Sequence, residues 1–351
     1  MTKPLFEVTR GRVTESVHYG SIAVVDSNGT LIASYGDPQM VAFLRSSAKP
    51  FQVLPFVERG GVEYFGFTPR ELSLSCASHE GSDMHIQAVR HLQEKIGIEE
   101  GNLQCGTHMP GDVAELKKLI VHDLKPTTNH NNCSGKHTAM LAHARMRDLP
   151  LENYLDPDHP VQRDILATFA WMCKLPVEQV ELGTDGCSAP NFAVPLYNAA
   201  LGFARMCDPR GLPEERAQAC RRITSAMNAY PEMASGYGEF DEQLMKAGNG
   251  KIITKRGAEG YQIVGLLSGT RGADSPGVGI AIKVSDGDAS RMGSGLESSN
   301  RVRPAVTVEI LRQLGVLTPE QEQSLAGFGP EKSITNHRGI LTGTSHPVFK
   351  L

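Results

Sequence analysis

A serine and a lysine near the N-terminus have the spacing of a nucleophile and its base. The stretch RSSAKP, residues 45–50, places Lys49 three residues after Ser46, with Pro50 directly behind it. If a helix opens here, both side chains project from one face about a turn apart. Because proline is accepted in a first helical turn, we expect the helix to begin near Ser47. Ser46 would then lie where backbone amides can hold a developing negative charge.

Lys49 can act as a base only if its pKa falls below the ordinary lysine value of about 10.4. Desolvation in an apolar site or a neighbouring positive charge produces such a shift. The apolar run FQVLPF at 51–56 and Arg45 can supply both. A serine followed by lysine three residues later is also expected about once by chance in such a chain. The alternative is therefore that Ser46 is only a helix N-cap.

A second group of reactive residues combines cysteine with lysine. NHNNCSGKHTAML, residues 129–141, sets Cys133 and Lys136 three residues apart at the start of a helix, and GTDGCSAP adds Cys187. Two thiolates and a nitrogen donor suit zinc, with water as the fourth ligand. Because no CxxC or HxxxH pair is present, structural thiols in the core are the alternative. His137 adjoins the lysine and is the histidine we would test first.

A second serine and lysine set lies further along the chain. SCASHEG at 75–81 contains Ser78, and TKRGAEG at 254–260 places Lys255 at the end of a late strand, before a tight turn. This arrangement resembles serine β-lactamases and penicillin-binding proteins, whose SxxK opens a central helix and whose Lys-x-Gly triplet lies on a late strand. No SDN triplet is present, which argues against antibiotic chemistry.

The elements that must position these residues are strands at both ends of the chain and helices between them. The segment at 21–36 reads as a hairpin turning at Asn28 and Gly29, a pair that tolerates positive φ. Apolar spacing of three and four residues predicts helices in the middle and one near the end. The ranges are 251–255, 261–267 and 277–287 for strands, with a turn at 257–260, and 84–98, 160–174, 213–230 and 303–314 for helices.

The simplest fold for this order is α/β of the α+β kind, with the terminal strands in one antiparallel sheet and helices packed on it. No linker, repeat or composition shift divides the chain, so we expect one domain over residues 1–351. A hydrophobic content of 40% supports a large core.

Composition also excludes several classes of partner and compartment. A net charge of -4 with scattered Lys and Arg argues against nucleic acid. The chain shows no signal peptide and no run of apolar residues long enough to cross a membrane. Seven cysteines form an odd set, which favours reduced thiols. We therefore expect a cytoplasmic protein.

Six blocks of sequence together resemble the rhizobial type of L-asparaginase, the class 3 or asparaginase II family. The blocks occur in the same order and span nearly the whole chain, so they are more specific than any single motif. They are EVTRGRVTESVHYGSIAVVD, LRSSAKPFQ, SCASHEG, NHNNCSGKHTAML, GTDGCSAPNF and KRGAEG.

This resemblance implies a homodimeric amidohydrolase that converts L-asparagine to L-aspartate and ammonia. It implies a fold similar to serine β-lactamases and glutaminases. It also implies two serine–lysine tandems, which fall on Ser46 with Lys49 and on Ser78 with Lys255.

The same resemblance implies a zinc site bound by two cysteines and a lysine. These ligands fall on Cys133, Lys136 and Cys187, and Asp185 looks like the residue that touches the metal-bound water. A lysine ligand must be neutral, so the metal has to depress its pKa.

The mechanism we expect is acyl transfer. Lys49 takes the proton of Ser46, and the Ser46 oxygen attacks the side-chain amide of asparagine. Ser78 and Lys255 relay a proton to the leaving nitrogen. Water then hydrolyses the acyl-enzyme. Backbone amides near Ser46 or Ser78 would hold the oxyanion, each worth roughly 3 kcal/mol. Arg45 is expected to bind the substrate α-carboxylate.

Two kinds of rival remain open. Within acyl transfer, the alternatives are a glutaminase or another β-lactamase-like hydrolase, including a penicillin-recognising peptidase. Outside enzymes, the alternative is a cytoplasmic zinc-binding regulatory protein in which Ser46 is only a cap.

Overall fold

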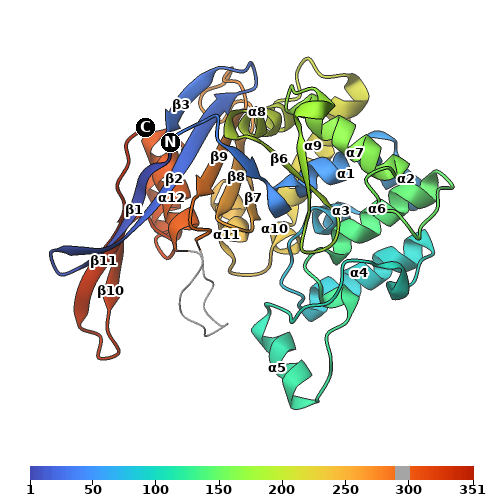
Figure 1. The fold of residues 1–351 in the computed structure, drawn as a ribbon, viewed down its shortest axis with the longest axis horizontal. Helices are drawn as coiled ribbons and strands as arrows, with labels where there is room; N and C mark the ends of the chain where they lie inside the picture. The colour runs from blue at the N-terminus through green and yellow to red at the C-terminus, as the bar shows by residue number, and fades with distance from the viewer. Residues whose placement is uncertain (289–300) are drawn as a thin grey trace. The chain divides into compact units, whose positions relative to one another are not determined.

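The computed structural model describes residues 1–288 and 301–351 of the chain. The chain groups into two compact units, each assembled from separate stretches of sequence. Unit 1 contains Met1–Ser47, Val194–Asp208 and Ala247–Leu351, and unit 2 contains Ala48–Ala193 and Pro209–Lys246. Figure 1 shows the elements of both units along the chain.

Unit 1 is built on an antiparallel sheet that joins the two ends of the chain. Its described strands follow the order β10-β11-β1-β2-β9-β8-β7, and β3 pairs with β2. The N-terminal strand β1 is therefore hydrogen-bonded between β2 and the C-terminal strand β11. The strands are β1 Lys3–Arg10, β2 Val13–Asp26, β3 Leu31–Tyr35, β7 Ile252–Gly257, β8 Tyr261–Leu266, β9 Val278–Val284, β10 Lys332–Thr335 and β11 Leu341–Pro347. The predicted mixed α/β fold, with one antiparallel sheet from terminal strands, is confirmed.

The predicted hairpin is present between β2 and β3. Gly29 has a φ of +95° and donates its N–H to the Asp26 carbonyl at 3.0 Å. The Asp26 carboxylate accepts from the amides of Asn28 and Thr30 at 2.9 and 2.8 Å, which closes the turn. Sequence reasoning missed β1, β10 and β11. Strands β10 and β11 have few buried residues and a weak apolar pattern. In β1 the adjacent buried residues Leu5 and Phe6 interrupt the alternation that predicts a strand.

Helices cover both faces of the unit 1 sheet. An added Cβ at Gly265 of β8 would meet Phe203 of α8, Leu196–Cys207, so α8 lies on that face. Gln262 of the same strand accepts a hydrogen bond at 3.1 Å from Arg303 of α12, Val302–Gln313. Positions 262 and 265 point to opposite faces of a strand, so the two helices lie on opposite faces.

Unit 2 is mainly helical. The predicted helices at 84–98, 160–174 and 213–230 are present as α4, α7 and α9, and 303–314 is α12 of unit 1; each end lies within two residues of its prediction. The helices are α1 Lys49–Glu58, α2 Gly61–Phe65, α3 Pro69–Ser75, α4 Asp83–Ile96, α5 Val113–Val121, α6 Ser134–Met146, α7 Pro160–Met172, α9 Glu214–Ala229, α10 Pro231–Ala234 and α11 Phe240–Ala247. The remaining elements are α13 Pro319–Ser324, β4 Val41–Phe43, β5 Glu181–Thr184 and β6 Pro190–Pro195, and the short helices η1 Arg45–Ala48, η2 Glu100–Asn102, η3 Thr128–His130 and η4 Val177–Gln179.

Helix α1 is the central element of unit 2. It packs against α6, α7 and α9, and every residue from Lys49 to Val57 is buried. The α-helix begins at Lys49, within two residues of the start predicted near Ser47, with Pro50 in its first turn. Residues 45–48 form the 3₁₀ turn η1 before it. Such turns are common at helix N-termini because they satisfy part of the unpaired backbone.

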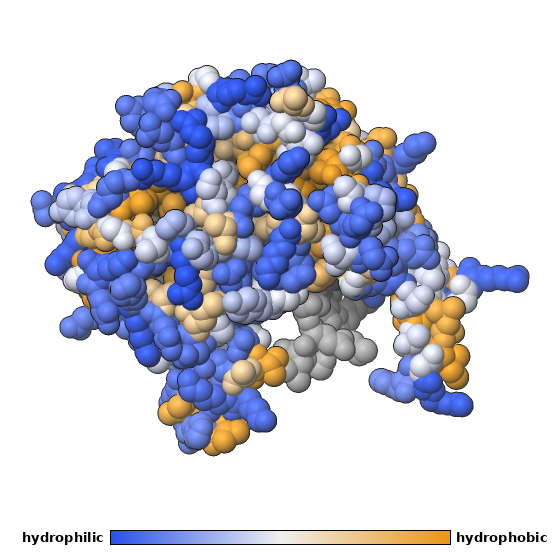
Figure 2. All heavy atoms as spheres, turned by 180° about the vertical axis from the view of Figure 1, so that it is seen from behind, coloured by the Kyte–Doolittle hydropathy of each residue, from blue (hydrophilic) through white to orange (hydrophobic). Residues whose placement is uncertain are grey.

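The surface of unit 2 includes exposed apolar side chains on α5. Val113, Ile120 and Val121 are each more than half exposed. Figure 2 shows orange, apolar side chains among the blue ones at the lower left. Among the residues described, no helix is long and apolar enough to cross a membrane.

Candidate active site

The Lys49 amine is buried in unit 2 and is held by three oxygen atoms. Nζ lies 2.9 Å from Ser78 Oγ and 3.2 Å from the Asn132 carbonyl, and it also contacts the Ala77 carbonyl. The side chain is 1% exposed because α1 is buried from its first residue. A lysine with no access to water is thus directed at a serine hydroxyl.

This geometry suits a neutral amine that accepts a proton. Carbonyl oxygens can only accept, so Ala77 and Asn132 each take one N–H of the amine. The third direction meets the hydroxyl of Ser78, which can donate into the lone pair of a neutral amine. Burial is the largest influence on the Lys49 pKa and lowers it, which favours the neutral amine, while the neighbouring Cys133 acts in the opposite direction.

Ser78 is held by the segment that follows α3. Its amide donates to the Ala234 carbonyl at 3.0 Å, the Ala77 amide donates to Leu74 at 3.0 Å, and the His79 amide donates to Asn132 at 3.3 Å. These three amides donate to carbonyl groups within the tight turn after α3 and its neighbours. The expectation that amides near Ser46 or Ser78 hold the oxyanion stays a prediction.

The predicted cysteine and lysine cluster comes together at the start of α6. Cys133 is the N-cap of that helix, and the Lys136 amine lies 3.1 Å from the sulfur of Cys187. The Cys133 Sγ also lies 3.1 Å from Asn132 Oδ1. Cys187 reaches the cluster from the loop between β5 and β6, where Ser188 has a φ of +67°. All three candidate ligands are buried.

Cys187, Cys133 and Lys136 shift one another's pKa values. A hydrogen bond from the Cys133 thiol, assisted by the charge of Lys136, lowers the pKa of Cys187. The same hydrogen bond and burial raise the pKa of Cys133, so that thiol keeps its proton. Burial opposes a charge on Lys136, but the negative Cys187, with Cys133 and Asp185, raises its pKa above the ordinary value.

His137 and Asp185 surround this cluster. The imidazole Nδ1 of His137 lies 2.6 Å from Tyr154 Oη, while its buried Nε2 has no hydrogen-bond partner in the described part of the chain. Burial lowers the His137 pKa to about 4, so the ring is neutral. Asp185 is half-buried, and its Oδ1 accepts from the Gly186 amide at 2.7 Å.

The donor set is compatible with zinc. Tetrahedral zinc with ordinary bond lengths sets a sulfur and a nitrogen ligand roughly 3.6 Å apart, and the Lys136 to Cys187 distance is 3.1 Å. The His137 ring adds a buried nitrogen near the same sulfur. Over residues 1–288 and 301–351, no three His, Cys, Asp or Glu side chains are placed to hold a metal, so such a site depends on the lysine.

The remaining predicted residues belong to unit 1. Arg45 and Ser46 are half-buried in η1, and Lys255 is buried in β7. The hydroxyl of Ser47 donates to the Lys255 carbonyl at 2.7 Å, and the Lys255 amine donates to the Arg256 carbonyl at 3.3 Å. The turn that carries Ser46 is therefore bonded to the strand that carries Lys255.

Close packing explains the glycine of KRGAEG. A Cβ at Gly257 would meet the Leu44 carbonyl at 2.4 Å, so β7 and the residues before η1 approach as closely as glycine allows. Arg45 itself has a φ of +53°, which is unusual for a residue other than glycine. This backbone directs the chain from β4 into η1.

Sequence reasoning missed several residues of the site. The carbonyl groups of Ala77 and Asn132 carry no side-chain signal, so their contact with Lys49 could not be read from a motif. Tyr154 had no signal either, and Ser134 was hidden inside a block whose neighbours appeared more reactive.

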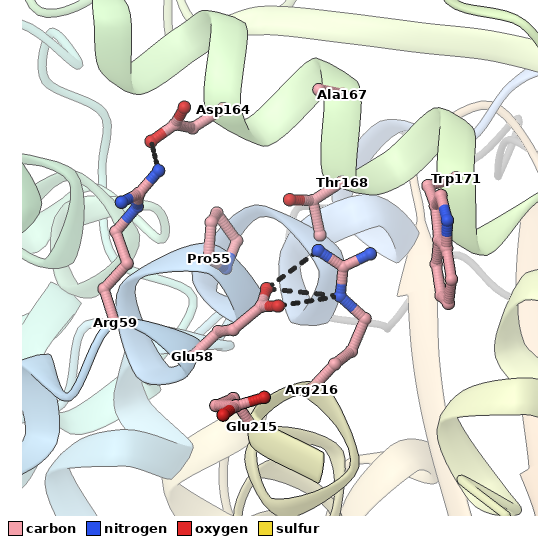
Figure 3. A pocket seen from close by; sticks show the side chains of 9 residues that line it. All are labelled: Pro55, Glu58, Arg59, Asp164, Ala167, Thr168, Trp171, Glu215 and Arg216. Carbon is pink, nitrogen blue, oxygen red and sulfur yellow. Dashed lines mark hydrogen bonds and ion pairs between the residues drawn. The ribbon is translucent and has the colours of Figure 1, made fainter. Parts of the chain in front are cut away.

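A separate hollow of about 500 Å³ lies at the C-terminal end of α1, shown in Figure 3. Arg216 pairs with Glu58 at 2.9 Å and stacks on Trp171, and Arg59 pairs with Asp164 at 2.9 Å. None of the predicted site residues lines it. These charged groups bind one another, so we assign no chemistry to this hollow.

Comparison with known proteins identifies one family. A model described as L-asparaginase II matches residues 6–347 of the chain. No curated protein gives a significant match.

Solved structures give only distant similarity. A probable glutaminase from Bacillus subtilis, complexed with 6-diazo-5-oxo-L-norleucine, is 12% identical with a TM-score of 0.40, over 85% of this chain and 84% of that one. A Bacillus glutaminase in the presence of 4.3 M NaCl is 11% identical with a TM-score of 0.38, over 85% of this chain and 91% of that one. Similarities of this size add nothing to the assignment of fold or substrate.

Proposed function

The chain belongs to the L-asparaginase II family, and from that premise we propose that it hydrolyses L-asparagine to L-aspartate and ammonia. The observation that carries this proposal is the buried Lys49 amine, 2.9 Å from Ser78 Oγ and oriented by two carbonyl groups. A desolvated amine beside a hydroxyl is the arrangement that activates a serine nucleophile.

In the proposed reaction, a serine oxygen attacks the side-chain carbonyl carbon of asparagine. Ser46 is our first candidate for this serine, and its proton passes to Lys49. The C–N bond then breaks, the nitrogen takes up a proton relayed through Ser78 and Lys255, and ammonia leaves. Water attacks the resulting ester, which releases aspartate and restores the serine hydroxyl.

Ser78 is a second candidate for the acylated serine, because its hydroxyl is the one that contacts the Lys49 amine. A slow substrate followed by mass spectrometry separates the two. An adduct on a peptide containing Ser46 supports the first candidate, and an adduct on Ser78 alone overturns it. Arg45 is proposed to bind the α-carboxylate of the substrate, in which case Arg45→Ala raises KM for asparagine.

We propose that zinc, if bound, is held by Cys133, Lys136 and Cys187, with Asp185 nearby. The metal would supply a fixed positive charge that positions the site. The chain's own residues must first change protonation: the ammonium of Lys136 and the thiol of Cys133 each lose a proton to become ligands. Metal uptake should therefore release protons and weaken as pH falls.

The decisive experiment follows ammonia from purified protein with L-asparagine, beside the Ser46→Ala, Ser78→Ala and Lys49→Met variants. We expect turnover by the wild type and a loss of at least about 10²-fold in Lys49→Met. Glutamine in place of asparagine tests the glutaminase alternative. Folded wild-type protein that binds zinc and releases no ammonia from either substrate would favour the zinc-binding regulatory protein.

Three further properties are proposed with this function. The fold is of the serine β-lactamase kind, the protein acts in the cytoplasm, and the active form is a homodimer. None of the seven cysteines forms a disulfide, which is consistent with a reducing compartment. Sedimentation analysis tests the homodimer directly.

A further inference from the structure

We propose that His79 is a positioning residue for the Lys49 amine, because it joins the two segments whose carbonyl groups hold that amine. This inference rests on the proposed function, since it gives His79 a role in the same reaction. It assigns no proton transfer to His79.

The two carbonyl groups around Lys49 come from different parts of unit 2. Ala77 belongs to the segment that follows α3, and Asn132 belongs to the segment that precedes α6. Nothing in the covalent chain keeps these segments together, because they are separated by more than fifty residues. Their relative position decides where the Lys49 amine points.

The His79 backbone makes the first link between the segments. Its amide donates to the Asn132 carbonyl at 3.3 Å, and the same oxygen accepts from Lys49 at 3.2 Å. The residue directly before His79 is Ser78, whose hydroxyl faces the amine. One carbonyl oxygen therefore sets the serine segment and the lysine relative to each other.

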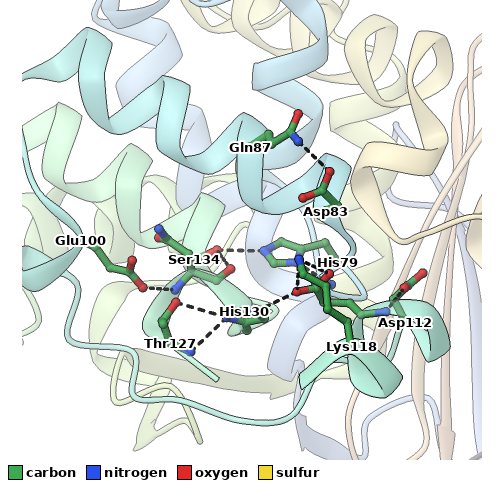
Figure 4. Close-up of polar contacts among 12 residues, drawn as sticks. His79, Asp83, Gln87, Glu100, Asp112, Lys118, Thr127, His130 and Ser134 are labelled. Carbon is green, nitrogen blue, oxygen red and sulfur yellow. Dashed lines mark hydrogen bonds and ion pairs between the residues drawn. The ribbon is translucent and has the colours of Figure 1, made fainter. Parts of the chain in front are cut away.

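The His79 ring makes the second link, and its direction follows from the donors present. The Gly81 amide donates to Nδ1 at 3.1 Å, so Nδ1 must accept. Nε2 then carries the hydrogen and donates to Ser134 Oγ at 2.8 Å, as Figure 4 shows. The Ser134 hydroxyl donates in turn to the Asn129 carbonyl at 3.2 Å. Because both ring nitrogens are used, neither can take a proton from the substrate.

Packing holds this ring in place. His79 is 1% exposed, and its ring stacks on His85 with centroids 5.0 Å apart and an interplanar angle of 15°. His85 is held by Ser82 Oγ at 2.6 Å and the Glu232 carbonyl at 3.0 Å. Burial also lowers the His79 pKa well below its usual value, which keeps the ring neutral.

Kinetics of five variants test the inference. We expect His79→Ala to lower kcat for asparagine by about 10- to 100-fold with little change in KM, the usual effect of losing an outer-shell partner. His79→Gln should recover part of this loss, because its amide can donate toward Ser134. Ser134→Ala should also lower kcat, and combining it with His79→Ala should add little, because both act through one link. His122→Gln, at an exposed position after α5, is the control and should match the wild type.

A second measurement does not depend on activity. Nitrogen NMR of the full-length protein should show His79 as the Nε2–H tautomer, and hydrogen exchange should be faster at residues 77–81 and 129–134 in Ser134→Ala and His79→Gln than in the wild type. Unchanged exchange in both variants, or kcat in His79→Ala equal to the control, overturns the inference. If the wild type does not hydrolyse asparagine, the proposed function fails. The His79 tautomer and the hydrogen-exchange rates of the variants then still decide whether His79 links the two segments. If His79→Ala does not fold, His79→Gln and Ser134→Ala carry the test.

Discussion

At the scale of single residues, the environment of Lys49 decides whether it can act as a base. An exposed lysine stays charged at neutral pH and cannot accept a proton. Lys49 is instead buried, and both carbonyl oxygens that it contacts accept hydrogen bonds without offering a negative charge to stabilise an ammonium. Burial of the Lys49 side chain away from water, and not the residue type alone, favours the neutral amine that can accept a proton.

The pH dependence of turnover tests this environment. Because burial lowers the Lys49 pKa below its usual 10.5, the protonated, inactive fraction should disappear at lower pH than for an ordinary lysine. We expect kcat to rise with pH and to reach its plateau below pH 10.5. Lys49→Arg should lose about 10²- to 10⁴-fold, because arginine stays protonated.

The exposed Lys117→Arg, in α5, is the matched control and should keep the wild-type rate. A wild-type kcat that is still rising above pH 10.5 would contradict the lowered pKa of Lys49.

At the scale of elements, the site depends on how closely α6 approaches the end of α3. Gly135, in the first turn of α6, allows this approach: a Cβ there would lie 2.4 Å from the Leu74 carbonyl. That oxygen belongs to the backbone of α3, so it cannot move aside as a flexible side chain would. The glycine between the two candidate ligands of α6 thus has a packing role.

Replacing this glycine should separate the helices. We expect Gly135→Ala to lower the free energy of unfolding by about 1–3 kcal/mol, the usual effect of overpacking, and to reduce turnover because Asn132 and Cys133 shift. Gly101→Ala is the control, since no atom lies within 4 Å of a Cβ there. Urea denaturation measures both variants, and an equal midpoint for the two would contradict the close approach.

At the scale of the whole molecule, buried neutral histidines make stability sensitive to acid. Burial is the main cause that lowers the pKa of His79, His85, His137 and His143. The unfolded chain takes up protons at these positions near their ordinary pKa, whereas the folded protein does not until the pH is much lower. Proton uptake therefore favours the unfolded state as pH falls.

His143 provides the clearest measurement of this effect. Its pKa is lowered from 6.5 to about 3. The contribution of the neutral His143 ring to the free energy of unfolding is therefore complete above pH 6.5 and is lost progressively toward pH 3. At pH 5 the loss is about 2 kcal/mol for this one group. We expect His143→Leu to reduce the difference in unfolding free energy between pH 7 and pH 5 by that amount, measured with urea.

His122→Gln should leave the same difference unchanged, because that histidine is exposed. If His143→Leu shows the same difference in unfolding free energy between pH 7 and pH 5 as the wild type, groups other than His143 cause the acid sensitivity.

The sequence by itself determined the local features of this protein. The Asn28–Gly29 hairpin, the helices α4, α7, α9 and α12, and the three-residue spacing of Cys133 and Lys136 follow from neighbours along the chain. Turn chemistry and helical periodicity act over a few residues, so a sequence pattern can express them.

Only the tertiary structure decided which groups surround the Lys49 amine. Its partners Ala77, Ser78 and Asn132 lie 28, 29 and 83 residues away. Two of them are backbone carbonyl groups, which every residue has and no motif reveals. Their approach depends on the packing of α1, α3 and α6, and on whether a glycine lets two backbones meet, so it is a property of the folded unit and not of any segment.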